Sequence, residues 1–151
     1  MMMWSLLGAT FVLCAIAGFP TKWWVDMGRW SQTAWRRRTV RQLERALARQ
    51  AGAQNFVAGT SFLPSGVGLA LDPAAQKLFL AVRDGNGLTS AILPFSAVRE
   101  VQSGEVNDSG FHDYYVDLTM REGARPVWRL LCGEDSALAS TMAAEVEKAL
   151  A

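Results

Sequence analysis

The sequence has few of the residues that build the commonest compact sites. It contains two cysteines, Cys14 and Cys132, and one histidine, His112. These numbers exclude a disulfide scaffold, a zinc module of cysteine and histidine, and any mechanism that needs two histidines. Lys+Arg total 15 and Asp+Glu total 14, so the net charge of +1 gives no global signal for nucleic-acid binding. Half of the 151 residues are hydrophobic, which excludes wholesale disorder and allows one domain with an attachment.

The near-neutral total hides an uneven distribution of charge. Residues 22–49, which we call the neck, hold eight basic and two acidic residues and carry a net charge of +6. The body from residue 50 onward holds seven basic and twelve acidic residues, a net charge of −5. A basic segment joined to an acidic body predicts an interaction surface in the neck.

The first 19 residues contain no charged side chain, and Pro20 follows them. At about 1.5 Å per residue, a helix of this length spans roughly the hydrocarbon core of a bilayer. Trp23 and Trp24 then fall at the level of the lipid headgroups, beside Lys22. We therefore expect residues 1–21 to be a single-pass transmembrane anchor. Because all the positive charge follows the apolar run, the positive-inside rule predicts a cytoplasmic body.

A cleaved signal peptide is the alternative interpretation of the same segment. Ala15-Ile16-Ala17 resembles the small-residue site at which signal peptides are cut. Secretory signals usually begin with a basic residue, however, and none precedes this apolar run. The sequence favours the uncleaved anchor, and cleavage would instead release a periplasmic globular binding protein.

The neck is expected to form a basic juxtamembrane helix rich in Trp and Arg, within residues 22–53. Ser31 is a candidate N-cap for a helix over residues 32–50, and Gly52 is a candidate for its end. A short apolar stripe follows helical spacing at Val40, Leu43 and Leu47.

The polar and aromatic residues of the neck are the expected membrane-interface residues. They are Lys22, Trp23, Trp24, Trp30, Trp35, Arg36, Arg37, Arg38, Arg41 and Arg45. Three roles stay open for the neck: charges that only fix topology, contact with anionic lipid, or packing of the apolar stripe on the body or on a second copy. Lipid contact would contribute about 1 kcal/mol per arginine near the surface. No recognition fold or base-stacking motif accompanies the arginines, so nucleic acid is not an expected partner.

From residue 55 onward the hydrophobic period changes from helical to alternating. We expect seven strands, over residues 55–63, 67–71, 77–83, 88–93, 97–102, 114–121 and 127–132. Asp84-Gly85-Asn86-Gly87 is a strong hairpin signal. Val98 and Val101 do not share a face of a regular strand, which predicts a bulge. Residues 103–113 are expected to form a polar loop.

The period returns to helical after Gly133, where Leu138, Met142 and Val146 share one stripe. We expect this terminal helix to pack on the strands near Trp128. The predicted fold is therefore mainly β with helices: a seven-stranded barrel or sandwich over residues 54–151, capped by a C-terminal α-helix.

Three phrases of the body, at residues 68–72, 76–80 and 92–101, resemble those of bacterial pleckstrin-homology-like (PH-like) proteins. In these proteins an apolar strand ending in Asp, a Lys-led strand and a Pro-Phe-Ser run followed by Val-x-x-Val recur. The resemblance covers roughly residues 55–151. It implies a PH-like fold with a binding or scaffolding role rather than a chemistry.

Eukaryotic members that bind phosphoinositides use a basic first hairpin, and this sequence departs from that pattern. The loops at residues 64–66, 72–73 and 84–87 carry no cluster of Lys and Arg. Recognition of inositol phosphate by the body is therefore not expected, and any lipid contact is assigned to the neck.

The candidates for chemistry are weak. A cation site built from Glu105, Asp108 and Asp113 around His112 is conceivable, but the spacing matches no EF-hand, and a solvated acidic loop is the favoured interpretation. Cys132 is expected to be an inert buried thiol. No nucleophile, base or metal set converges in the sequence, so we expect neither an enzyme nor a cofactor.

These features predict a membrane-anchored, cytoplasm-facing PH-like interaction or scaffold module. The expected location is the bacterial inner membrane, with lipid bound through residues 1–49. The sequence does not identify the expected protein partner, and it is compatible with a homo-oligomer.

Overall fold

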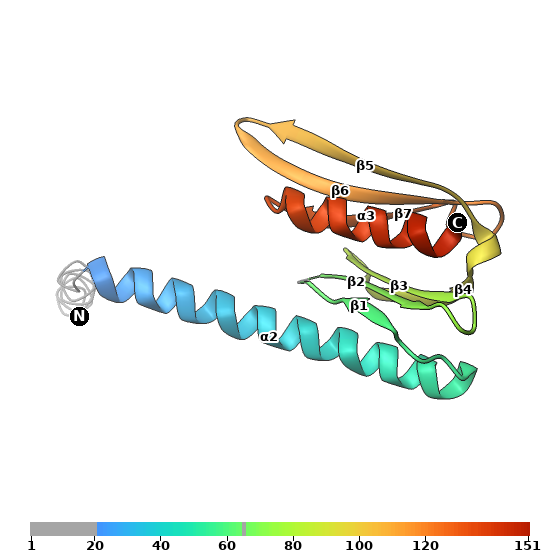
Figure 1. The fold of residues 1–151 in the computed structure, drawn as a ribbon. Helices are drawn as coiled ribbons and strands as arrows, with labels where there is room; N and C mark the ends of the chain where they lie inside the picture. Colours follow the sequence, from blue (N-terminus) through green and yellow to red (C-terminus); the bar gives the residue numbers. More distant parts are fainter. Residues whose placement is uncertain (1–20, 65) are drawn as a thin grey trace, which may run out of the picture. The chain divides into compact units, whose positions relative to one another are not determined.

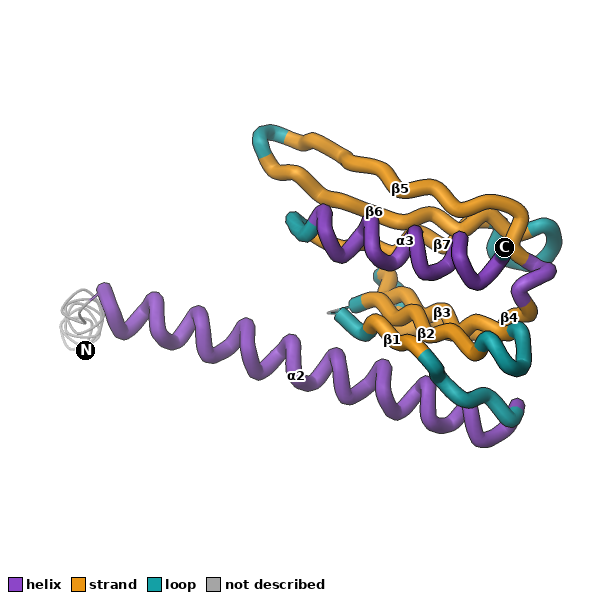
Figure 2. Tube along the Cα trace, viewed as in Figure 1, coloured by secondary structure: helices purple, strands orange, loops and turns teal. Residues whose placement is uncertain are grey.

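The computed structural model describes residues 21–64 and 66–151, with side chains from residue 31 onward (Figure 1). Figure 2 shows the two long helices at the start and end of the described chain, with the strands between them. The elements, in chain order, are α2 (Thr21–Gln54), β1 (Thr60–Phe62), β2 (Val67–Asp72), β3 (Lys77–Asp84), β4 (Gly87–Pro94), the 3-10 helix η1 (Phe95–Ala97), β5 (Val98–Asp108), β6 (Phe111–Met120), β7 (Val127–Gly133) and α3 (Ser136–Leu150). The chain divides into two compact units, one up to Arg37 and one from Arg38 onward, which are described separately.

The seven strands form two antiparallel sheets in the second unit. The first sheet has the order β1-β2-β3-β4, and the second has the order β5-β6-β7. Each strand pairs with its neighbour in the sequence, so hairpins and short turns connect the strands within each sheet. The mainly β class, the seven strands and the C-terminal helix predicted from the sequence are confirmed.

The main core lies between the two sheets and α3. It combines the inner faces of both sheets with one stripe of the helix, where Met142 and Val146 are 0% and 1% exposed. Trp128 belongs to the same cluster, so the predicted packing of the terminal helix near this residue is confirmed. Asp135 caps α3 by accepting a hydrogen bond from the Leu138 N–H at 2.8 Å.

The central strands β2 and β3 are buried on both faces. Alternate residues such as Leu69 and Leu80 face the main core, whereas Ala70 and Phe79 face the other side. On that side they form a second cluster with α2, which we call the outer cluster; its buried members are Leu43, Phe56, Ala70, Phe79, Ala81 and Ile92. The apolar stripe of the neck therefore packs on the body of its own chain, through Leu43 and the partly buried Leu47.

Gly68 on β2 lies close to Leu43 of α2. A Cβ atom there would stand 3.3 Å from Leu43 Cδ2, 3.3 Å from Ala81 Cβ and 3.2 Å from Leu63 Cδ2. These separations are below ordinary van der Waals contact, so the absence of a side chain at residue 68 permits the close approach.

Helix α2 is longer than the sequence pattern predicted. It begins at Thr21, so Ser31 lies inside the helix and is not its cap, and it continues through Gly52 to Gln54. Asn55 has a positive φ of 51°, and the Phe56 N–H donates to the Ala51 carbonyl at 3.1 Å. This is a Schellman ending, in which Asn adopts the left-handed conformation and Phe56 turns into the outer cluster. Gly52 does not end the helix, because the next two residues, Ala53 and Gln54, favour a helical conformation.

Two further assignments, a strand over residues 55–63 and a loop over residues 103–113, were also wrong in part. The strand expected over residues 55–63 is only β1, because the preceding segment is fixed by other bonds: the Val57 N–H donates to Asp72 and the Gly59 N–H donates to the Leu71 carbonyl.

The polar loop expected over residues 103–113 is instead a long β5–β6 hairpin that turns at Ser109-Gly110, where both φ values are positive. Most of its exposed residues are polar, although Val106 and Phe111 are also exposed, and this polar composition resembled that of a loop. The predicted bulge in β5 is confirmed, between Val98 and Glu100.

Candidate functional site

The expected membrane-interface residues Lys22, Trp23, Trp24 and Trp30 all lie in α2, but their side chains are outside the described part of the structure. The anchor expected at residues 1–21 lies almost wholly outside the described residues. In the part of the chain that the structure describes, no helix is both long enough and apolar enough to cross a membrane.

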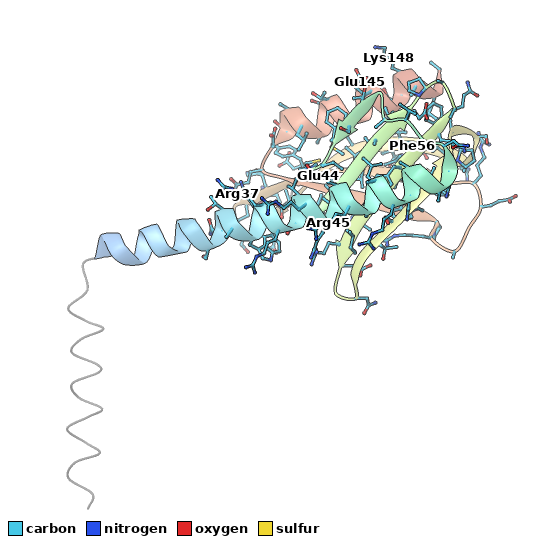
Figure 3. All side chains as sticks on the ribbon, turned by 90° about the horizontal axis from the view of Figure 1, so that it is seen from below. Arg37, Glu44, Arg45, Phe56, Glu145 and Lys148 are labelled. Carbon is cyan, nitrogen blue, oxygen red and sulfur yellow. The ribbon has the colours of Figure 1, made fainter. Side chains whose placement is uncertain are left out.

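The remaining members of this set have described side chains. In the first unit Trp35, Arg36 and Arg37 are exposed, and Trp35 has 55% of its surface accessible. In the second unit Arg38, Arg41 and Arg45 are exposed on the part of α2 that packs on the first sheet. Figure 3 shows this part of the helix, with Arg45 on its surface and Phe56 beyond its C-terminal end.

An open cleft of about 580 Å³ lies between α2 and the β3–β4 hairpin, and we call it the basic cleft. Its charged lining is Arg45 and Arg49 from the helix and Arg83 from the end of β3. The other lining residues are Gln42, Ala46, Gln50, Gly87, Leu88 and Ser90. The lining therefore combines three cations with polar side chains and a small apolar surface.

Two hydrogen-bonded contacts join the walls of the basic cleft. Arg83 Nη2 donates to Gln42 Oε1, which ties the end of β3 to the helix. Gln50 Nε2 donates to Ser90 Oγ at 2.9 Å and to the Ser90 carbonyl at 3.2 Å, which ties the helix to β4. Gln50 Oε1 is buried at the base and accepts no hydrogen bond from the described residues. The cleft thus has a defined frame before any ligand is added.

No acidic side chain is among the lining residues of the basic cleft. The nearest acid in the sequence of the hairpin, Asp84, pairs instead with Arg125 at 3.6 Å and accepts from the Asn86 N–H at 3.0 Å. Three guanidinium groups around one opening repel each other and attract anions, because their charge has no partner within the lining.

The sequence predicted Arg45 as a functional residue but missed the rest of the basic cleft. Arg49 was counted only in the charge of the neck, and Arg83 was only the last residue of the strand expected over residues 77–83. The missed signal was the pair Phe79 and Ala81, which gives β3 a second apolar face. An apolar second face of β3 must be covered by another element of the chain. The apolar stripe of the neck was available to cover it.

The acidic segment around His112 does not gather three carboxylates. In the β5–β6 register Glu105 opposes Tyr114 and Asn107 opposes His112, and His112 Nδ1 contacts Glu105 Oε1. Asp108 and Asp113 belong to the alternate register positions, which face the other side of the ribbon. The described residues contain no group of three or more His, Cys, Asp or Glu that could hold a metal ion.

Cys132 lies at the end of β7, half-buried against α3. Its Sγ is 3.8 Å from Met142 Sδ. Burial, assisted by the negative charge of Asp135, raises the pKa of the Cys132 thiol to about 11. The thiol is therefore protonated at neutral pH and is a poor nucleophile there.

Asp72 is the one buried carboxylate among the described residues. Its oxygens accept hydrogen bonds from the Val57 N–H at 2.7 Å and the Ala75 N–H at 3.0 Å. These backbone donors, Val57 first, lower the pKa of Asp72 below its ordinary value. The carboxylate has a structural role, since it fixes the chain between α2 and β1 to the end of β2.

No family model matches the chain, and neither curated proteins nor solved structures give a significant match.

Proposed function

We propose that this protein is a membrane-anchored PH-like interaction module that faces the cytoplasm and serves as a subunit of a larger assembly in a bacterial inner membrane. The observation that carries the proposal is the order of elements. Four antiparallel strands, then three, then a packed C-terminal helix, is the order of the PH-like superfold that the sequence phrases resemble.

The N-terminal part of the sequence supports the membrane address. An apolar run without charge precedes a helix with exposed arginines, and this order favours retention of the arginines on the cytoplasmic side. A binding role, rather than catalysis, is supported by the described residues. The Cys132 thiol is protonated at neutral pH, so it is a poor nucleophile. The basic cleft, by contrast, is lined by three arginines and attracts anions.

Fractionation and topology test this function directly. We expect the full chain to remain with membranes after carbonate extraction. A reporter that is active only in the cytoplasm should be active when fused after Ala151, and a reporter that is active only in the periplasm should be inactive there. Affinity purification of the full chain from detergent extracts should recover the same partner from repeated preparations. Recovery of a soluble chain beginning near Gly18 would reject the anchor and support the periplasmic alternative.

A further inference from the structure

The part of the structure with the clearest unassigned chemistry is the basic cleft between α2 and the β3–β4 hairpin. We infer that it binds the phosphate group of a phosphate ester through Arg45, Arg49 and Arg83. The inference uses only residues of the second unit and does not rest on the membrane address proposed above.

The charge of the lining selects an anion. Three arginines line the opening and no acid does, so a ligand of charge about −2 relieves repulsion that nothing else in the lining offsets. Each planar guanidinium carries five N–H donors and matches phosphate oxygens in pairs. A carboxylate would satisfy fewer of these donors than the three terminal oxygens of a phosphomonoester.

The frame of the cleft positions the donors from two sides. Arg83 is held against the helix by its hydrogen bond to Gln42, whereas Arg45 and Arg49 project from successive turns of α2. The contact between Gln50 and Ser90 fixes the helix to β4 beneath them. Arginines from both walls therefore line the same opening.

The size of the cleft indicates more than a bare phosphate ion. A volume of about 580 Å³ lies within the range of about 300–1,000 Å³ that is usual for sites of small organic ligands. Leu88 and Ala46 add apolar surface beside the arginines. A phosphate ester of a small polyol fits this combination, and it can come from a soluble metabolite or from the headgroup of an anionic lipid.

Calorimetric titration of the full chain in a neutral detergent tests the inference with two probes. One probe is glycerol 3-phosphate, and the other is a short-chain phosphatidic acid, a lipid phosphomonoester, with the matching phosphatidylcholine as the zwitterionic reference. We expect saturable binding of at least one of the two anionic probes. Stronger binding of glycerol 3-phosphate assigns a soluble source, and stronger binding of phosphatidic acid, with little binding of phosphatidylcholine, assigns a lipid source.

Matched charge variants locate the binding. Arg83→Gln and Arg49→Gln should each raise the dissociation constant about tenfold or more, because each removes a charge-assisted contact. Arg41→Gln removes the same charge from the same helix outside the lining, and it should change the constant less than about twofold. The melting temperature without ligand verifies that each variant is folded.

Two results would overturn the inference. One is the absence of saturable binding by both anionic probes in the folded wild-type protein. The other is an equal loss of binding in Arg41→Gln and Arg83→Gln, which would mean that only the overall positive charge of this region attracts the anion. Either result leaves the fractionation and topology experiments unaffected, so the two proposals fail separately.

Discussion

Helices α2 and α3 both cover β-sheet in the second unit, yet only one of them could be recognised as a covering helix from its own sequence. In α3 the buried residues Ala139, Met142, Ala143 and Val146 form a regular stripe within one short helix. In α2, beyond Arg38, only Leu43 is a fully buried large side chain, and exposed arginines surround it. A helix can therefore cover a sheet through a few contacts. In such a case the apolar partners on the strands, rather than the helix sequence, reveal the packing.

The largest expected effect comes from the helix in the main core. Met142→Ala should lower the free energy of unfolding by about 2–5 kcal/mol, because it removes a fully buried side chain and leaves a cavity. Glu147→Ala, an exposed site on the same helix, should cost less than about 0.5 kcal/mol. Thermal melts of the two variants compare them, and equal melting temperatures would contradict the described packing of α3.

The corresponding change in α2 should cost less. Leu43→Ala also empties a fully buried site, but the helix can settle toward Gly68, so we expect a loss of about 2–3 kcal/mol at the lower end of the usual range. Denaturant unfolding of this variant beside Arg41→Ala, an exposed neighbour, measures the contribution of the outer cluster. A loss no larger than that of Arg41→Ala would show that the neck does not stabilise the body.

The close contact between α2 and β2 sharpens the comparison further. Gly68→Val should destabilise the protein by about 1–3 kcal/mol, because the new side chain meets Leu43, Leu63 and Ala81. In the double variant with Leu43→Ala the added side chain has room. The loss of stability in the double variant should therefore be smaller than the sum of the two single losses, by more than about 0.5 kcal/mol. Strict additivity in this double-mutant cycle would indicate that the residues do not touch.

The smallest expected effect concerns Asp72, which joins the end of α2 to the first sheet. Its pKa in the folded state is lowered from 3.8, so its contribution to stability is fully present above that value and is lost as the pH falls through the folded pKa. The stability advantage of the wild type over Asp72→Asn should thus be constant near neutral pH and shrink in acid. Urea midpoints measured from neutral pH down to about pH 3 follow this difference.

Asp113→Asn is the matched control, since it removes one exposed carboxylate from β6. Its difference from the wild type should stay small throughout. A difference between wild type and Asp72→Asn that stayed constant down to the lowest pH would contradict the lowered pKa of Asp72.

The sequence predicted most of the fold because hydrophobic alternation and turn residues mark the strands locally. It failed where an interaction distant in the sequence decides the outcome. Asn55 ends α2 because the next residue, Phe56, turns into the outer cluster, and no local signal distinguished it from Gly52. The outer part of the β5–β6 hairpin, residues 103–113, was predicted as a loop because most of its residues, including Ser109 in its turn, are polar.

The candidate site was predicted less well than the fold for the same reason. Arg45 and Arg49 are close in the sequence, but Arg83 joins them only because α2 packs across the first sheet. The orientation of α2 depends on Leu43 and on the contact of Gln50 with Ser90. A site shared between a helix and a strand 34 residues later is a product of tertiary packing, which periodicity alone does not reveal.

Strand β5 has a further consequence, for colloidal behaviour. It stands at the end of its sheet, and among the described strands only β6 pairs with it, so its other edge could recruit a strand from another molecule. The bulge between Val98 and Glu100 distorts this edge, and the exposed acids Glu105 and Asp108 place negative charge along it. Aggregation through β5 is therefore opposed by both the bulge and the negative charge.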